Sequence, residues 1–171
     1  MKQIFESDNI CFVEVSELLV NDYLAMVNDE KNFTMFTGGR AKSYTAEQEL
    51  RWVKKKLEEK TFVFSMLEKP GNRFIGNIEL MHLKDTEGEL GIGITANMQN
   101  RGFGTEAVPA FTEYAMRKLG LKRIFLRTSP NNARAIHVYK KCGFREYDRT
   151  EEDVFMELRP GKARGVRSPS D

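Results

Sequence analysis

Cysteine and long apolar runs are both scarce in this chain. Its 171 residues include only Cys11 and Cys142, so we expect free thiols rather than a disulfide framework. No run approaches the roughly 18 apolar residues that a membrane-spanning helix needs. Residues 1–10 contain Glu6 and Asp8 and lack the apolar segment of a signal peptide. These absences favour a cytoplasmic protein that does not bind membranes.

A large excess of charge of one sign is also missing. The chain has 27 basic and 25 acidic residues, a net charge of +2. Residues 160–171 hold three of the basic residues and one acidic residue, which leaves residues 1–159 with 24 of each. A neutral domain is a poor electrostatic match for nucleic acid. We therefore expect one domain over residues 1–159 without a nucleic-acid partner, followed by a basic tail whose Gly, Pro, Arg and Ser content predicts disorder.

Hydrophobic periodicity and turn signals predict an α+β fold. Apolar residues alternate along the expected strands and recur at helical spacing in the expected helices. The expected strands are residues 10–15, 62–67, 74–83, 89–95, 123–128, 144–147 and 154–158, and the expected helices begin at Ser16, Thr45, Thr105 and Asn132. Short turns favour a mostly antiparallel sheet flanked by helices. The strand–helix–strand unit over residues 89–128 should be parallel and right-handed.

Local capping signals support these helix limits. Ser16 is expected as an N-cap, and Thr45 with Gln48 resembles a capping box. Gly120 is expected to close the helix that begins at Thr105. The glycine pair at 38–39 interrupts the first helical pattern.

Several conspicuous residues have only structural interpretations. His82 and His137 are isolated, and no metal-ligand spacing exists, so no metal is expected. Trp52 is expected to be a packing residue of the second helix, and the lysine run 54–56 predicts a solvated face. Pro109 falls inside an expected helix, where it removes a backbone hydrogen bond, so we expect a kink there.

The strongest functional signal is the segment from Gln99 to Gly104, at an expected strand-to-helix junction. Glycines permit a tight turn and a close approach of the backbone to a ligand. The following helix N-terminus offers unpaired N–H groups and a partial positive charge, which suits a pyrophosphate. Arg101 and the Thr105 hydroxyl would add a charge and a donor. By itself the segment also fits an ordinary glycine turn before a helix.

The strand before this segment has an unusual pattern. Alternation places Gly91 and Gly93 on one face and Leu90, Ile92 and Ile94 on the other. Interior glycines weaken a strand and mark the close approach of a ligand or another backbone. Close packing of a helix on the glycine face is the alternative.

A third segment combines a capping residue with a tyrosine. Asn132 is a suitable N-cap, and Tyr139 stands seven residues later, which places both on one side of a helix. Tyr139 alone also fits a core aromatic residue whose hydroxyl is hydrogen-bonded.

All three segments resemble the GNAT superfamily of acetyl-coenzyme A-dependent N-acetyltransferases. Gln99-x-x-Gly102-x-Gly104 is similar to its Q/R-x-x-G-x-G/A coenzyme A signature, and residues 132–144 resemble its N-x-x-A-x-x-x-Y-x-K-x-G-F segment. The run 104–107 is similar to the branch that acetylates ribosomal-protein N-termini, polyamines and aminoglycosides. The resemblance implies the GNAT fold and direct acetyl transfer from acetyl-coenzyme A (acetyl-CoA) to a primary amine in a ternary complex.

The resemblance also implies roles for individual residues. Coenzyme A would lie between strands 89–95 and 123–128, where the N–H of Ile94 would polarise the thioester carbonyl. Tyr139 would protonate the leaving thiolate, since a tyrosine with a pKa of ~10 keeps its proton at neutral pH. The implied cofactor-binding residues are Ile92, Gly93, Ile94, Gln99, Asn100, Arg101, Gly102, Phe103, Gly104, Thr105, Asn132, Ala135 and Tyr139.

The general base is less well defined. Some family members carry a glutamate five residues before the motif asparagine, and Arg127 stands at that position. Glu79 and Glu89, on adjacent expected strands, are candidate catalytic bases, and a water chain is an alternative. Both carboxylates also fit a solvated strand surface.

The acceptor stays open among a protein N-terminus, a polyamine, an aminoglycoside and similar amines. Carboxylates that would suit the mouth of a site for a cationic amine are Asp29, Glu30, Glu47 and Glu49. Two other functions are open: a non-catalytic acyl-CoA sensor on the same fold, and an interaction domain that works through its tail. Tyr139 favours an enzyme, because a sensor needs no proton donor. A homodimer is compatible with this interpretation.

Overall fold

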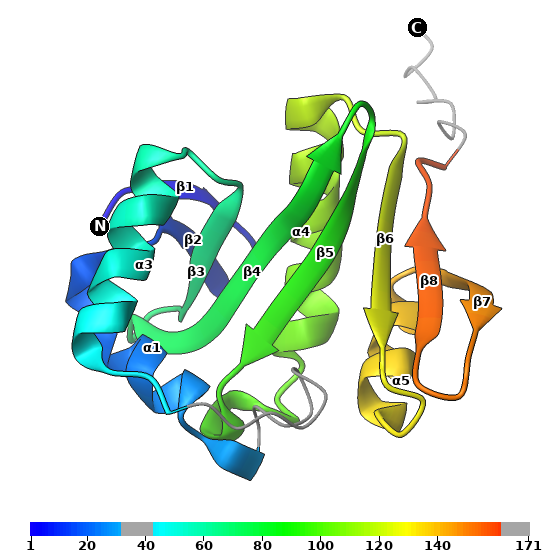
Figure 1. Ribbon diagram of the computed structural model, residues 1–171. Coiled ribbons are helices and arrows are strands. Elements are labelled where there is room, and N and C mark those ends of the chain that lie inside the picture. Colours follow the sequence, from blue (N-terminus) through cyan, green and yellow to red (C-terminus); the bar gives the residue numbers. More distant parts are fainter. Residues whose placement is uncertain (32–42, 162–171) are drawn as a thin grey trace, which may run out of the picture.

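A mixed sheet of eight strands, in the order β1-β2-β3-β4-β5-β6-β8-β7, forms the centre of the computed structural model, which describes residues 1–31 and 43–161 (Figure 1). The strands are β1 (Gln3–Glu6), β2 (Ile10–Glu14), β3 (Val63–Glu68), β4 (Arg73–Lys84), β5 (Glu87–Ile94), β6 (Arg123–Thr128), β7 (Arg145–Arg149) and β8 (Val154–Leu158). The α-helices are α1 (Val20–Val27), α3 (Ala46–Glu58), α4 (Phe103–Leu119) and α5 (Ala133–Lys141), and short 3-10 helices lie at Glu17–Leu19 and Ala96–Met98. The predicted α+β fold with a mostly antiparallel sheet is confirmed.

Helices cover both faces of the sheet and create two apolar cores (Figure 1). On one face, α1 and α3 bury Tyr23 and Val53 against side chains of β2 and β3. On the other face, α4 and α5 pack on the central strands, and Tyr139 belongs to this core. Because side chains alternate along a strand, β2 sends Phe12 to the α4 core and Val13 to the α1–α3 core.

The structure differs from the expected elements mainly at the N-terminus. The sequence prediction misses β1, a four-residue edge strand whose end residues are exposed, so that it shows no full apolar alternation. β6 and β8 have the predicted limits. α4 begins at Phe103, earlier than expected, and α5 begins at Ala133, directly after its predicted N-cap Asn132. The glycine pair at 38–39 and residues 162–171 lie outside the described residues.

The predicted caps are present. The Ser16 side chain accepts from the N–H of Leu18 at the start of the short helix that precedes α1. Thr45 and Gln48 form both hydrogen bonds of a capping box at α3. Gly120 ends α4 in the left-handed conformation, with φ at 66°. These local signals therefore defined the ends of the helices correctly.

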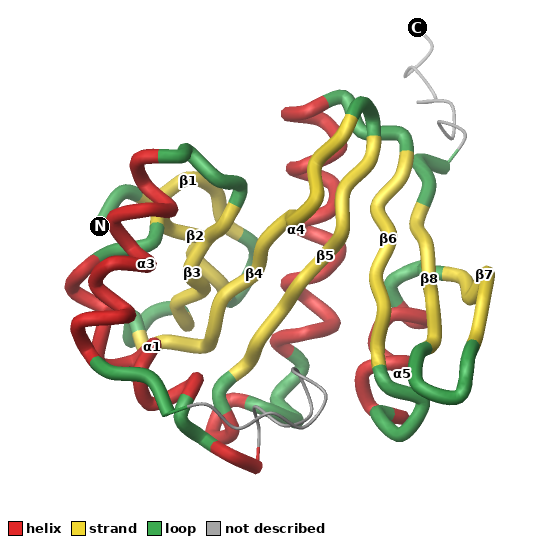
Figure 2. Tube along the Cα trace, in the orientation of Figure 1, coloured by secondary structure: helices red, strands yellow, loops and turns green. Residues whose placement is uncertain are grey.

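β5 and β6 pair over a short distance. Glu87 to Glu89 lie opposite Arg123 to Phe125 in parallel, as predicted for this unit. Beyond Glu89 the two strands diverge, which is visible as the widening space between β5 and β6 in Figures 1 and 2. β5 continues to pair with β4 up to Ile94, opposite Gly76. The second half of β5 thus has one edge that no described strand covers.

Candidate active site

The second half of β5 directs part of its backbone toward the diverging β6. The Thr95 N–H donates to the Ile75 carbonyl at 2.9 Å across the β4–β5 ladder. Bonded and non-bonded pairs alternate in an antiparallel ladder, so Ile92 and Ile94 turn their backbone groups away from β4. The Gln99 side chain already binds one of these groups, because its Nε2 donates to the Ile94 carbonyl at 2.9 Å.

The N-terminus of α4 is open. Gly102 is its N-cap, provides no side-chain cap and has φ at 84°, a left-handed value that favours glycine. A Cβ atom on Gly102 would meet nothing within 4 Å, so the space outside the cap is clear. The first N–H groups of a helix have no intrahelical partner, and Phe103, Gly104 and Thr105 stand there. The helix dipole adds a partial positive charge, which fits an anionic ligand.

The first turn of α4 also contacts both other segments that the sequence singled out. A Cβ atom on Gly104 would lie 3.5 Å from Ile94 Cδ1 and 3.6 Å from Val138 Cγ1. From α5, the Cys142 thiol donates to the Thr105 carbonyl, with a sulfur–oxygen distance of 3.9 Å. That carbonyl lacks its usual helical donor, because Pro109 has no N–H, although α4 continues through the proline. The end of β5, the start of α4 and α5 therefore meet here.

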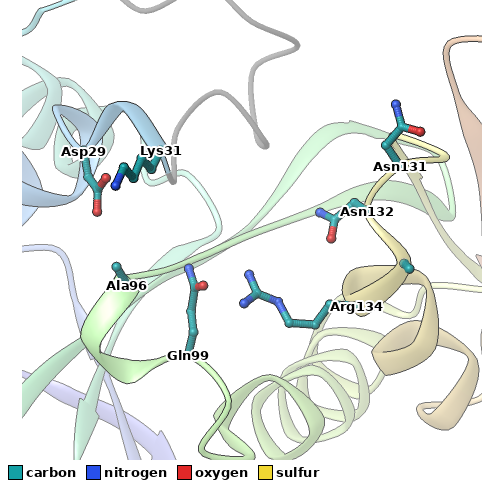
Figure 3. A pocket seen from close by; sticks show the side chains of 8 residues that line it. Asp29, Lys31, Ala96, Gln99, Asn131, Asn132 and Arg134 are labelled. Atoms are coloured by element: carbon teal, nitrogen blue, oxygen red, sulfur yellow. The ribbon is translucent and has the colours of Figure 1, made fainter.

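A pocket of about 390 Å³ opens beside this junction (Figure 3). Its lining comes from the segment after α1, the β5–α4 connection and the start of α5, namely Asp29, Lys31, Ala96, Gln99, Asn131, Asn132, Ala133 and Arg134. Figure 3 shows the Arg134 side chain extending toward Gln99, with Asp29 and Lys31 on the opposite side of the pocket. Two cationic side chains and one carboxylate give the lining a net positive charge.

Several lining residues were not among the predicted site residues. Asn131 and Arg134 flank the motif residue Asn132, but they occupy positions that the motif leaves unspecified. Lys31 comes from a distant part of the chain, and no local signal connects it to α5. For Asn131 and Arg134, the only signal in the sequence was their proximity to Asn132.

Asn132 combines a cap with a place at the pocket. Its Oδ1 accepts from the Ala135 N–H at 3.1 Å, which confirms the predicted cap, and the residue is buried. Its amide NH₂ group is not used by the cap. Ala135 supplies the capped N–H and packs its methyl group against the α4 core. Both residues therefore shape the start of α5 at the pocket.

The Tyr139 ring is enclosed while its hydroxyl reaches the surface. The ring packs against Phe144, with the centroids 5.7 Å apart. The hydroxyl makes no hydrogen bond with any described residue. Every side-chain oxygen of the described residues that is fully buried does have a hydrogen-bond partner. The Tyr139 hydroxyl is therefore not fully buried and touches the accessible surface. Burial, followed by the nearby Cys142 thiol, raises the pKa of Tyr139 to about 12. This arrangement does not match a core tyrosine with a satisfied hydroxyl.

Two predicted binding side chains turn away from the open helix end. The Arg101 guanidinium pairs with Glu68 on β3 at 2.6 Å and lies over the Phe103 ring, 5.2 Å from its centroid. Phe103 is itself buried in the α4 core. Phe103 therefore offers the site its backbone N–H, and the charge of Arg101 is already offset by Glu68. Asn100, at φ 58°, contributes to the tight turn.

The two candidate bases are engaged in ion pairs. Glu79 on β4 accepts from Lys56 of α3 at 3.0 Å. Glu89 on β5 has a side chain only 12% exposed, lies 2.7 Å from His82 Nδ1, and lies 3.7 Å from the Arg127 guanidinium. Neither is the solvated carboxylate of the alternative interpretation. The predicted solvated face at 54–56 is wrong for Lys56, because this side chain is directed to the sheet.

The two β5 glycines lie on the face covered by α1 and α3. A Cβ atom on Gly93 would stand 3.6 Å from Met26 Sδ of α1, and one on Gly91 would stand 2.9 Å from Met81 Cε. Packing by neighbouring side chains therefore accounts for both glycines. Their effect on the site is indirect, since they let α1 and β4 side chains approach β5.

The described residues contain neither a cluster of metal ligands nor a membrane-spanning helix. Within 1–31 and 43–161, no group of three or more His, Cys, Asp and Glu is placed to hold a metal ion. Both cysteines have free thiols, as predicted. In the same part of the chain, no helix has the length and apolarity required to cross a membrane.

Related sequences point to N-acetyltransferases. The chain is 29% identical over 93 residues to a spermidine N(1)-acetyltransferase from Vibrio cholerae, which covers 53% of this chain and 54% of that protein. It is 28% identical over 103 residues to an uncharacterized N-acetyltransferase from Bacillus subtilis, 60% of this chain and 61% of that protein. The chain thus spans about half to three fifths of the length of these curated relatives.

Solved structures and a family model lead to one family. A GNAT-family acetyltransferase from Bacillus anthracis matches with a TM-score of 0.79 and 17% identity, over 90% of this chain and 96% of that chain. The spermidine N-acetyltransferase from Vibrio cholerae in complex with CoA and spermine matches with a TM-score of 0.78 and 16% identity, over the same shares. At these identities the likeness shows the shared fold. The protein-family model described as an acetyltransferase (GNAT) domain matches residues 9–145 of this sequence. The chain therefore belongs to the GNAT acetyltransferase family.

Proposed function

We propose that this chain is an enzyme that transfers the acetyl group of acetyl-CoA to a primary amine. The observation that carries the proposal is the meeting of the open α4 N-terminus, the uncovered edge of β5 and the start of α5 at one pocket. Membership of the GNAT family supports the same class of reaction.

The anionic part of coenzyme A fits the open end of α4. The N–H groups of Phe103, Gly104 and Thr105 would hold the pyrophosphate, helped by the helix dipole. Arg134 pairs with no carboxylate among the described residues and extends into the pocket, so it is a suitable phosphate ligand (Figure 3). The glycine at 102 keeps the approach to these donors clear.

The uncovered edge of β5 suits an extended, amide-containing ligand arm. The backbone groups of Ile92 and Ile94 point to this edge, where the pantetheine would pair in the manner of a strand. We assign to the Ile94 N–H the polarisation of the thioester carbonyl. Gln99 holds the Ile94 carbonyl, and the Asn132 amide would donate to the same arm. Gly93 lies between the two isoleucines within the β4–β5 ladder.

Tyr139 is the proposed general acid. In the transfer, the amine nitrogen forms a bond to the acetyl carbon, and the bond from that carbon to sulfur breaks. Tyr139 then gives its proton to the sulfur, and the proton that the amine loses returns to Tyr139 through water, so that no net proton is consumed. With its pKa raised to about 12, Tyr139 still holds this proton when the thiolate forms. Burial also disfavours a bare thiolate, which favours protonation of the sulfur within the site.

The acceptor amine must also lose a proton during the transfer. Glu79 and Glu89 are the side-chain candidates, and each already binds a cation. Direct proton acceptance by either would disturb its ion pair with Lys56 or Arg127. We therefore favour water as the carrier, with the two carboxylates shaping the field around it.

Among amine acceptors, a polyamine is favoured. One relative is named as a spermidine N(1)-acetyltransferase, and one structural neighbour contains CoA and spermine. A protein N-terminus and an aminoglycoside also present a primary amine, so both are included as acceptors in the test below.

The test has a binding arm and a turnover arm. Coenzyme A at 100 times its dissociation constant should stabilise the fold by ~2.7 kcal/mol and raise the melting temperature. Release of thiol from acetyl-CoA is then measured with spermidine, spermine, an aminoglycoside and an Ala-starting peptide. Stabilisation without turnover on any amine would favour the non-catalytic sensor, and an unchanged melting temperature would refute coenzyme A binding.

A further inference from the structure

Glu49 of α3 is a buried carboxylate without a partner. The residue is 6% exposed, and its side chain makes no hydrogen bond or ion pair within residues 1–31 and 43–161. The other buried polar side chains there, Ser65, Thr112 and Asn132, each make at least one hydrogen bond. The hydroxyl of the buried Tyr139 also lacks a partner, but Glu49 is the one of the two that carries a negative charge when ionised at neutral pH.

The position of Glu49 opposes folding. A carboxylate that leaves water without gaining a partner loses its hydration, and burial raises the pKa of Glu49 for this reason. A glutamine of nearly the same shape would avoid most of this cost. A buried polar group without a protein partner calls for an explanation, such as a ligand, a catalytic role or a bound water.

The carboxylate oxygens can nevertheless be reached from outside. Every fully buried side-chain nitrogen or oxygen of the described residues has a partner, and Glu49 has none. Both of its oxygens must therefore touch the accessible surface, while the rest of the side chain is enclosed. A charge that meets them there is less screened than in open water.

Glu49 lies on the side of α3 that is turned to the sheet. It stands one turn before Val53, which is fully buried, and two turns before Lys56, which contacts Glu79 on β4. In Figure 1, α3 begins near the end of the sheet where β5 finishes and where β6 has diverged. Glu49 is thus on the α1–α3 side of the strand that would hold the thioester.

On the same side of α3, the ammonium group of its own Lys56 is bound by Glu79 of β4. Lys56 Nζ lies 3.0 Å from Glu79 Oε2 and 5.7 Å from the centroid of the Trp52 ring. Trp52 also packs edge-on against Tyr23, at 5.5 Å between centroids, which confirms its predicted packing role. The ring face of Trp52 adds a cation–π contact to the ion pair of Lys56. Glu49 offers the carboxylate about 10 Å along the helix, without a lysine.

We propose that Glu49 binds the ammonium group of the acceptor, so that a cationic primary amine completes the missing ion pair. The inference rests on the proposed acetyltransferase function and assigns the residue that selects the acceptor. A metal ion is a poor alternative, since no group of three or more potential ligands surrounds any point of the described structure.

The test compares Glu49→Gln with Glu58→Gln, the same chemical change at an exposed position of the same helix. With spermidine as the probe amine, Glu49→Gln should raise the KM for the amine roughly 10- to 100-fold, the effect of losing a charged hydrogen bond. The KM for acetyl-CoA should stay parental, and the melting temperature should be equal or higher, because an unpaired buried charge is removed. Glu58→Gln should change none of these.

Each outcome decides the proposal. A parental KM for spermidine in Glu49→Gln, or a lower melting temperature of this variant, overturns it. If the parent acetylates only the Ala-starting peptide, the KM for that peptide replaces the KM for spermidine. If the parent acetylates no amine, the proposed acetyltransferase function fails independently of Glu49. The role of Glu49 is then tested by the binding of spermidine. The coenzyme A-loaded parent should then be stabilised by spermidine and Glu49→Gln should not, whereas no stabilisation of the parent overturns the proposal.

Discussion

Replacing Tyr139 by phenylalanine separates its chemical role from its packing role. The variant keeps the ring, its contact with Phe144 and its burial in the α4 core. It removes only the hydroxyl, which has no hydrogen-bond partner among the described residues. Any large effect of Tyr139→Phe on turnover must therefore come from the loss of a proton donor.

The two readouts should respond very differently. Loss of a general acid lowers kcat by roughly 10²- to 10⁴-fold, about 2.7–5.5 kcal/mol of transition-state stabilisation. A core tyrosine with a satisfied hydroxyl would instead lose about 1 kcal/mol of unfolding free energy. No such bond exists for Tyr139, so the free energy of unfolding should change by less than about 0.5 kcal/mol. The dissociation constant for coenzyme A should change little as well.

The assay measures kcat, the dissociation constant for coenzyme A and urea unfolding on the same preparation of Tyr139→Phe. A kcat within threefold of the parent would refute the assignment of Tyr139 as the acid. The pH dependence gives a second check. Because burial raises the pKa of Tyr139 to about 12, its neutral form favours the fold at neutral pH, and this contribution is lost as the pH rises from ~10 toward 12. Alkaline unfolding of the parent should therefore be steeper than that of the variant.

Three further predictions concern other parts of the chain. Gly102→Asp should weaken coenzyme A binding, measured by calorimetry, far more than Gly102→Asn. Both side chains meet the same left-handed backbone, and only aspartate repels a pyrophosphate. Equal affinities of the two variants for coenzyme A would argue against the site. A chain that ends at Arg159 should keep parental turnover, and a loss would assign a role to residues 160–171. At Glu106, burial raises the pKa, but the hydrogen bonds from Ser7 and Asn9 outweigh it and lower the pKa. Glu106→Gln should therefore destabilise the fold above pH ~4.3 and have less effect as the pH falls below this value. An equal loss of unfolding free energy at pH 3 and pH 7 in urea would contradict this.

The sequence by itself determined the elements that carry local signals. β6 and β8 have the predicted limits because each is a short run of alternating residues between clear turns. The capping box at Thr45 and the left-handed Gly120 involve only residues within one turn of the helix end. β1 escaped prediction because an edge strand is half exposed and is defined by its partner β2.

Only the tertiary structure decided which charged groups meet. Arg101 pairs with Glu68, 33 residues away in the chain, and the approach of β3 to the start of α4 sets this contact. Glu47 and Glu49 are two residues apart on one helix, yet the Glu47 side chain is 79% exposed and Glu49 is buried. The helical turn places them on different sides of α3, and the packing of that helix on the sheet decides which side is covered. Periodicity in the sequence cannot supply this, because burial of a carboxylate depends on the surface that meets it.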